Sequence, residues 1–130
     1  MVLGVGVDAV EVARIRRAVD RWGEAFLNRV YTPAELARAS GRDGPARLAV
    51  RFAAKEAVMK ALGYGWGRVR FRDIEVTRDP GGRPQARLYG AAARLAEQAG
   101  VVAVHLSLSH THGYAVAVAV AEGRREAGDR

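Results

Sequence analysis

The only two lysines of this 130-residue chain, Lys55 and Lys60, lie close together within Arg51–Gly63, although lysine and arginine together number 21. Everywhere else positive charge is supplied by arginine. An ammonium is a compact charge that can give up a proton, which a guanidinium does poorly, so proton-transfer chemistry is one interpretation of this asymmetry. The alternatives are chance, or two lysines making ordinary contacts on a helix surface.

An acidic residue accompanies the second lysine. Phe52, Glu56 and Lys60 follow at four-residue intervals, so on a helix they share one face. A carboxylate and an ammonium at this spacing can form a plain surface ion pair, worth only about 0.3–0.5 kcal/mol. The aromatic Phe52 on the same face favours partial burial or a ligand-lined groove, which would perturb both charges. The spacing alone leaves both interpretations open.

A second carboxylate, Asp8, follows a valine- and glycine-rich segment at the N-terminus. Asp8-Ala9-Val10-Glu11 has an acidic capping-box spacing, so Asp8 could simply cap the helix that follows. The preceding Gly4-Val5-Gly6 is not a dinucleotide-binding fingerprint, because the third glycine and the onset of the helix are misplaced. The sequence therefore leaves two roles open for Asp8: a helix cap, or a residue of a functional site.

Polar side chains also gather on the penultimate predicted strand, where His105, Ser107 and Ser109 share one face. His110 and Thr111 follow at the strand end, where functional residues often lie. The alternative is a solvated sheet face, which we favour for His105. The sequence has no G-x-S-x-G elbow, so a serine hydrolase of that type is not indicated.

The elements that must position these residues follow from hydrophobic periodicity and from capping and turn signals. Thr32-Pro33-Ala34-Glu35 is a capping box, and Gly63 is a helix stop. The last strand alternates valine with alanine, which indicates close packing against a second layer or another subunit. In chain order we expect a buried strand over 2–9, a helix with Val12, Ile15, Val19 and Trp22 on its apolar face, helices over 24–30, 33–40 and 45–62, a strand over 71–76, its return arm over 85–89, a helix over 90–99, and strands over 102–109 and 114–121.

Composition limits the class of protein. The hydrophobic fraction of 49% and the charged fraction of 27% are ordinary globular values. There is no cysteine, so disulfides, thiolate catalysis and cysteine-ligated zinc are excluded. We see neither a signal peptide nor an apolar run of the roughly 20 residues that span a bilayer, and therefore expect a cytoplasmic protein with no membrane partner. One domain over 1–122 with a frayed polar tail over 123–130 is the expected organisation.

The net charge of +7 predicts an anionic partner, which could be nucleic acid, an acidic protein or a phosphorylated small molecule. A small basic RNA-binding domain is therefore an alternative function. Aromatic residues make up only 7% of the chain and do not interleave with arginine along a strand, so no base-stacking platform is evident.

Three segments in the right order resemble the holo-acyl-carrier-protein synthases, the small class of 4′-phosphopantetheinyl transferases. They are Gly4-Val5-Gly6-Val7-Asp8, then Arg51–Gly63, then Ser107–Thr111 with Tyr114-Ala115. The resemblance extends over about residues 2–122, and its central segment is highly specific. Ala9 departs from the larger aliphatic residue usual after the aspartate. The resemblance implies an α+β fold in which an antiparallel sheet packs against a long central helix.

The resemblance also implies an activity. The expected reaction transfers phosphopantetheine from coenzyme A to a serine of an acidic apo acyl carrier protein, depends on Mg²⁺ and releases adenosine 3′,5′-bisphosphate. The expected assembly is a homotrimer with active sites between subunits, and nucleic acid is not an expected partner. The implied setting is fatty acid biosynthesis, although the native carrier, fatty-acid or polyketide, stays open.

Carried over to this chain, the resemblance makes Asp8 and Glu56 the metal ligands and Lys60 the catalytic lysine. It implies no role for Lys55. Two further sets follow from it. The residues expected near coenzyme A are Arg51, Phe52, Gly63, Gly65, Ser109, His110 and Thr111. The residues expected to dock the carrier protein are Arg14, Arg17 and Arg21.

Overall fold

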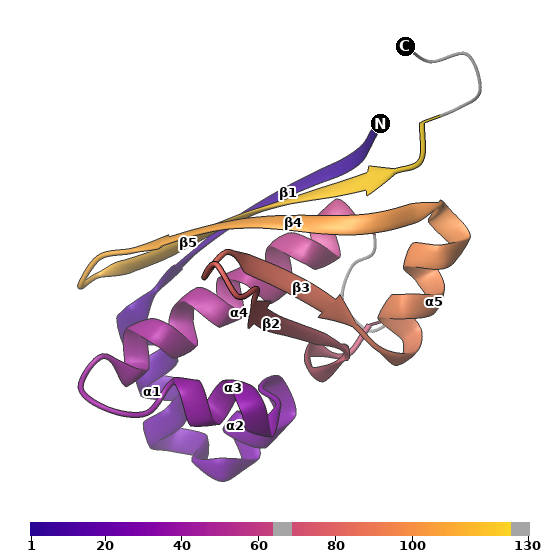
Figure 1. The fold of residues 1–130 in the computed structure, drawn as a ribbon. Coiled ribbons are helices and arrows are strands. Elements are labelled where there is room, and N and C mark those ends of the chain that lie inside the picture. Colours follow the sequence, from indigo (N-terminus) through magenta and orange to yellow (C-terminus); the bar gives the residue numbers. More distant parts are fainter. Residues whose placement is uncertain (64–68, 126–130) are drawn as a thin grey trace.

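The computed structural model describes residues 1–63 and 69–125. One five-stranded sheet, in the order β1-β5-β4-β3-β2, packs against the long helix α4 (Figure 1). All neighbouring strands are antiparallel. The α+β class, with an antiparallel sheet on a long central helix, is therefore confirmed.

The elements follow the expected order with small shifts at their ends. Residues 71–73, expected in a strand, form a short 3₁₀ turn, in which the Asp73 carboxylate accepts a hydrogen bond from the Arg70 amide at 3.3 Å. The elements are β1 (Val2–Glu11), α1 (Val12–Trp22), α2 (Glu24–Val30), α3 (Pro33–Arg38), α4 (Gly44–Ala61), β2 (Ile74–Arg78), β3 (Pro84–Leu88), α5 (Gly90–Ala99), β4 (Val101–His110) and β5 (Tyr114–Gly123).

The core lies between the sheet and α4. Four alanines of β5, Ala115, Ala117, Ala119 and Ala121, are fully buried and face this helix. Small side chains allow a helix to lie close to the sheet, so the layers pack at short range. The second-layer explanation of the alanine-rich face is therefore confirmed.

The opposite face of the sheet is open in the single chain. Val2, Val5 and Val7 of β1 are 63%, 61% and 56% exposed, and Val116 of β5 is 38% exposed. The prediction of a buried strand over 2–9 is therefore wrong, because β1 contacts the helix layer on one face only. Trp22, expected on the buried face of α1, is also exposed, and the guanidinium of Arg21 lies 5.0 Å from the centre of its ring.

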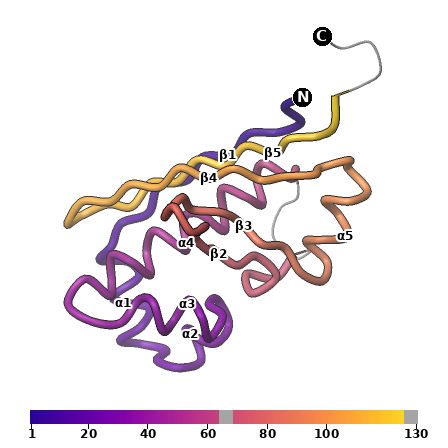
Figure 2. Tube along the Cα trace, viewed as in Figure 1, coloured from indigo at the N-terminus to yellow at the C-terminus, as the bar shows by residue number. Residues whose placement is uncertain are grey.

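The first and last strands run side by side to their ends, as Figure 2 shows. The Met1 ammonium donates to the Gly123 carbonyl at 3.0 Å, and the Gly123 amide donates to the Met1 carbonyl at 2.8 Å. The sheet thus extends one residue beyond the expected domain end. Among the described residues, no helix has the length and apolarity needed to cross a membrane.

Two glycines allow β1 to lie directly on α4. A Cβ on Gly4 would lie 1.9 Å from the carbonyl oxygen of Ala61, and a Cβ on Gly6 would lie 1.9 Å from that of Ala57. The atoms that a Cβ would meet belong to the backbone of α4 and cannot move aside at low energetic cost. Only glycine therefore permits β1 to lie this close to α4. Asp8 follows Gly4 and Gly6 on the same face of β1, so the close contact places it beside the C-terminal half of α4.

We expect Gly6→Ala to destabilise the protein by about 3 kcal/mol, because the added methyl group forces β1 away from α4. Gly113→Ala is the matched control, since a Cβ at Gly113 meets nothing within 4 Å. Denaturant unfolding of both variants measures the difference. Equal stability of the two variants would contradict this account of the glycine contact.

Candidate active site

Asp8 and Lys60 meet where β1 crosses α4. The Lys60 ammonium lies 3.2 Å from Oδ1 of Asp8 and donates to the Val7 carbonyl at 3.0 Å. The Lys60 side chain is half exposed, whereas the Asp8 side chain is only 15% exposed. The Lys60 ammonium thus lies between the mostly buried Asp8 carboxylate and solvent, where a ligand can reach it.

The capping interpretation of Asp8 is wrong. Strand β1 continues to Glu11, which is the residue that precedes α1, and no side chain caps that helix. The acidic spacing is present in the sequence, but pairing of β1 with β5 holds Asp8 in extended backbone opposite Ala117. Strand pairing therefore frees the carboxylate for the site.

Glu56 shares this site electrostatically. Partial burial raises the pKa of the Glu56 carboxyl, and the nearby Asp8 carboxylate raises it further, while Arg14 and Lys60 act in the opposite direction. A half-buried carboxyl whose ionisation is disfavoured by burial and by a neighbouring carboxylate is a common feature of functional sites.

The donor set suits Mg²⁺. Hard carboxylate oxygens are its usual protein ligands, and it needs only one or two of them because water and phosphate oxygens complete the octahedron. Within 1–63 and 69–125 no group of three or more metal-ligating side chains comes together. Asp8 and Glu56 thus fit a cation that is shared with a substrate, rather than one enclosed by protein.

Phe52 forms the buried base of this face of α4. Its ring is 6% exposed and stacks on Phe71 with centroids 5.2 Å apart. The Arg14 guanidinium of α1 lies 5.9 Å from the Phe52 centroid. The face of α4 that carries Phe52, Glu56 and Lys60 is thus partly buried rather than a plain surface, and Phe52 lies in the core.

The residues expected near coenzyme A fall at two places. Ser109, His110 and Thr111 lie exposed at the end of β4, and the Thr111 hydroxyl accepts hydrogen bonds from the amides of the following turn. Gly63 ends α4 with a φ of +79°, as the helix-stop prediction requires. Gly65 lies outside the described residues.

His110 borders two hollows. One, of about 380 Å³, is lined by His110, Thr111 and His112 together with Arg16, Arg42 and the start of α4. The other, of about 510 Å³, contains Arg51 and further arginines. His105 lies away from both, 3.1 Å from Glu122 on the exposed sheet face, as the preferred interpretation of it requires.

All four arginines of α1 are exposed, and they include the three expected to dock the carrier protein, Arg14, Arg17 and Arg21. Arg14 lies over Phe52 and acts on the charge of Glu56, so this helix reaches the site from one side. Arg21 lies against the ring of exposed Trp22. The helix presents an open basic surface next to the Asp8–Glu56–Lys60 site.

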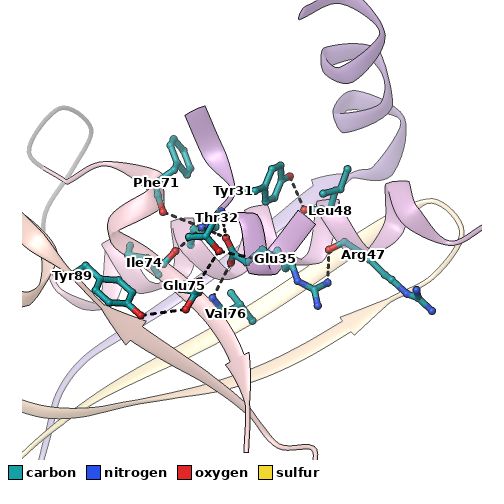
Figure 3. A network of polar contacts seen from close by, with 12 residues as sticks. Tyr31, Thr32, Glu35, Arg47, Leu48, Phe71, Ile74, Glu75, Val76 and Tyr89 are labelled. Carbon is teal, nitrogen blue, oxygen red and sulfur yellow. Dashed lines mark hydrogen bonds and ion pairs between the residues drawn. The ribbon is translucent and has the colours of Figure 1, made fainter. Parts of the chain in front are cut away.

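Lys55 has a different place from Lys60. It is fully buried, and its ammonium lies 2.7 Å from Oε1 of Glu35, itself fully buried. Figure 3 shows this Glu35 side chain between Thr32 and Val76. The ammonium also donates to the carbonyls of Phe71 and Ile74, at 3.0 and 2.5 Å. A guanidinium is too broad for this cage, and its planar fork does not match two carbonyls and a carboxylate around one point.

Glu35 connects three elements through the same network. Its Oε1 accepts from the Thr32 amide at 2.9 Å, which completes the predicted capping box of α3, and its Oε2 accepts from the Val76 amide of β2 at 2.8 Å. Sequence reasoning missed this pair. The one available signal was that Lys55, like Lys60, is a lysine where arginine is the rule.

The comparisons with known proteins agree with this fold. The family model for the 4′-phosphopantetheinyl transferase superfamily matches residues 4–119. The solved holo-[acyl-carrier-protein] synthase of Neisseria meningitidis has a TM-score of 0.85 and 39% identity, over 94% of this chain and 99% of that one. The enzyme of Helicobacter pylori, in complex with coenzyme A, has a TM-score of 0.80 and 33% identity, over 91% and 99%. The fold and the family match thus define a phosphopantetheinyl transferase.

Curated relatives narrow the class. A holo-[acyl-carrier-protein] synthase of Halothermothrix orenii is 49% identical over 111 residues, which is 85% of this chain and 89% of the relative. That of Syntrophus aciditrophicus is 43% identical over 128 residues, 97% of this chain and all of the relative. The chain belongs to the holo-acyl-carrier-protein synthase family within the phosphopantetheinyl transferases.

Proposed function

We propose that this enzyme transfers 4′-phosphopantetheine from coenzyme A to a serine of an acidic apo acyl carrier protein and releases adenosine 3′,5′-bisphosphate. The observation that carries the proposal is the convergence of Asp8, Glu56 and Lys60 at the crossing of β1 and α4. In this reaction the serine hydroxyl gives its proton to a base, and its oxygen forms a bond to the phosphorus that carries the pantetheine group. The bond from this phosphorus to the bridging oxygen of the diphosphate breaks, and the bisphosphate leaves with that electron pair.

Asp8 and Glu56 are the residues that would hold Mg²⁺, which when bound neutralises charge on the diphosphate and orients it. The partial burial of Glu56 raises its pKa, and the cationic neighbours Arg14 and Lys60 favour its ionised, ligating form. The backbone of Asp8 is held by pairing of β1 with β5, and the Lys60 ammonium contacts one oxygen of its carboxylate. The two groups are thereby positioned before substrate binds.

Lys60 lies at the exposed edge of this pair and would stabilise the leaving bisphosphate. Its ammonium contacts Asp8 Oδ1 and remains half exposed, so it can turn toward a phosphate oxygen while still anchored by the Val7 carbonyl. An ammonium can also donate a proton to the leaving oxygen, which a guanidinium does poorly. Arg51, Ser109, His110 and Thr111 stay proposals for coenzyme A contacts, as do Phe52, Gly63 and Gly65.

The open basic surface of α1 supports docking of an acidic carrier. Arg14, Arg17 and Arg21 are exposed on one helix, and Arg14 lies directly beside the site. Complementary charge of this kind raises the association rate and orients the partner more than it raises affinity. A carrier bound here would bring its serine to the edge of the Asp8–Glu56–Lys60 group.

The test of the function is direct. Purified protein is incubated with apo acyl carrier protein, coenzyme A and Mg²⁺, and the carrier is weighed by mass spectrometry. We expect the carrier to gain the mass of one phosphopantetheine and adenosine 3′,5′-bisphosphate to appear. No gain of mass with any acidic carrier tried would reject the proposal.

Glu56→Gln should raise the Mg²⁺ concentration needed for half-maximal activity by roughly tenfold or more, because it removes one charged ligand of a site with few. A Mg²⁺ titration of initial rates measures this. Glu97→Gln, on the exposed surface of α5, is the control of equal charge change. An unchanged titration for Glu56→Gln would argue against ligation by this residue.

The exposed valines of the outer sheet face support a homotrimer with active sites between subunits. Val5, Val7 and Val116 form part of an apolar surface that soluble monomers rarely leave open. We expect Val5→Glu to convert the assembly to monomers, measured by light scattering after gel filtration. Gln85→Glu, an exposed position elsewhere on the sheet, is the control, and a wild-type monomer would contradict the proposed trimer.

A further inference from the structure

Phe71 lies at the start of the 3₁₀ turn before β2, and its ring contacts the active-site side of α4. The ring stacks on Phe52 with centroids 5.2 Å apart and planes 20° from parallel. Phe52 lies in the core, whereas Phe71 is partly buried. Aromatic rings in contact favour a few relative orientations, so Phe71 limits how the Phe52 ring can turn.

The same Phe52 ring carries the Arg14 guanidinium of α1. The guanidinium carbon lies 5.9 Å from the ring centroid, within the range of a cation–π contact. Arg14 is exposed, and an exposed arginine side chain samples many rotamers, which docking of a partner must restrict. A ring that favours one placement of the guanidinium before the partner arrives lowers this entropic cost.

The backbone of Phe71 is held independently of its ring. Its carbonyl accepts hydrogen bonds from the Lys55 ammonium, at 3.0 Å, and from the Ile74 amide. Lys55 is fully buried and paired with Glu35, which keeps this anchor in place. Figure 3 shows the Phe71 carbonyl directed into the polar network and the ring directed away from it. The buried ion pair thus fixes the place from which the Phe71 ring reaches Phe52.

We propose that Phe71 is a positioning residue for Arg14: its ring, anchored through Lys55, holds Phe52 in the orientation on which the guanidinium lies. The inference rests on the proposed function, in which Arg14 docks the acidic carrier. The role requires no contact of Phe71 with the carrier or with coenzyme A. Its effect should therefore fall on the KM for the carrier, rather than on kcat or on the KM for coenzyme A.

The first test needs neither carrier nor coenzyme A. NMR of the isotope-labelled protein measures nuclear Overhauser contacts between the Arg14 side chain and the Phe52 ring. We expect these contacts in wild type and expect them to weaken by about half or more in Phe71→Leu, which keeps an apolar side chain but removes the ring. Leu36→Ala removes a partly buried side chain from α3 and should leave the Arg14 contacts unchanged. Thermal unfolding confirms that both variants are folded.

A double-mutant cycle then measures the coupling to Arg14 in the transfer assay. Phe71→Leu should raise the KM for the carrier by about three- to tenfold in the wild-type background. In the Arg14→Gln background the same change should have an effect of less than about twofold, because no guanidinium is left to position. Arg17→Gln, which removes a neighbouring docking charge, is the matched background and should leave the effect of Phe71→Leu in full.

The outcomes separate this inference from the proposed function. Absence of the Arg14–Phe52 contacts in wild type, or equal contacts in wild type and Phe71→Leu, overturns the proposal whether or not transfer occurs. An equal effect of Phe71→Leu with and without Arg14, or a loss confined to the KM for coenzyme A, also overturns it. Failure of transfer by wild type rejects the proposed function, while contacts that depend on the Phe71 ring still support its hold on Arg14.

Discussion

Lys60→Ala should lower kcat by about 10²–10³-fold, because it removes the cation proposed to stabilise the leaving bisphosphate as charge develops. The KM for coenzyme A should change much less, since the half-exposed ammonium contacts Asp8 and Val7 rather than a deep binding pocket. Initial rates of phosphopantetheine transfer at saturating Mg²⁺ measure both constants.

The matched variant is Lys60→Arg, which keeps the charge. We expect it to recover only part of the lost kcat, because a guanidinium donates a proton poorly and reaches Asp8 with a different geometry. Circular dichroism and thermal unfolding of both variants check that the fold is intact. Full activity of Lys60→Arg would show that charge alone is needed, and a kcat of Lys60→Ala close to wild type would remove Lys60 from the reaction.

Lys55→Met should destabilise the protein by about 3–5 kcal/mol, because it leaves the Glu35 carboxylate buried without its counter-charge. Such a loss is a large part of the 5–15 kcal/mol that separates folded from unfolded domains. The lost contacts join α4 to the carbonyls of Phe71 and Ile74 and, through Glu35, to α3 and β2. Urea unfolding measures the free energy.

A double-mutant cycle isolates the pair. Glu35→Gln alone leaves the ammonium buried without a carboxylate, whereas Lys55→Met/Glu35→Gln removes both charges, so the double variant should be more stable than the sum of the single losses predicts. Lys60→Met is the control for loss of a lysine and should cost less than about 1 kcal/mol, since that ion pair is partly exposed. Additive losses, or a Lys55→Met effect as small as that of Lys60→Met, would contradict the buried-pair account.

The lysine asymmetry shows how far a sequence statistic reaches. It marked the two positions where the chain has an ammonium in place of a guanidinium, and each of the two has its own ion pair. Lys60 lies in the site, and Lys55 lies in a cage that only a compact ammonium fits. The statistic could not separate the two roles, because their spacing along α4 says nothing about which side chain faces β1 and which faces α3.

Local signals predicted most of the elements. The capping box at Thr32 and Glu35, the stop at Gly63 and the helix between 44 and 61 depend on neighbouring residues, so their patterns are readable from sequence. The errors at β1 and Trp22 have one cause. Apolar periodicity identifies a face that avoids water, but it does not say whether the same chain covers that face.

The sequence by itself determined the family, the central helix with Glu56 and Lys60 on one side, and the basic surface of α1. Tertiary structure alone decided that Asp8 lies beside Lys60 rather than at the helix cap. The position of Asp8 depends on pairing of β1 with β5 and on two glycines that let β1 lie against α4. It also decided that four arginines from separate elements share one cavity. Contacts between residues distant in the chain are set by how layers pack, and no local pattern encodes that geometry.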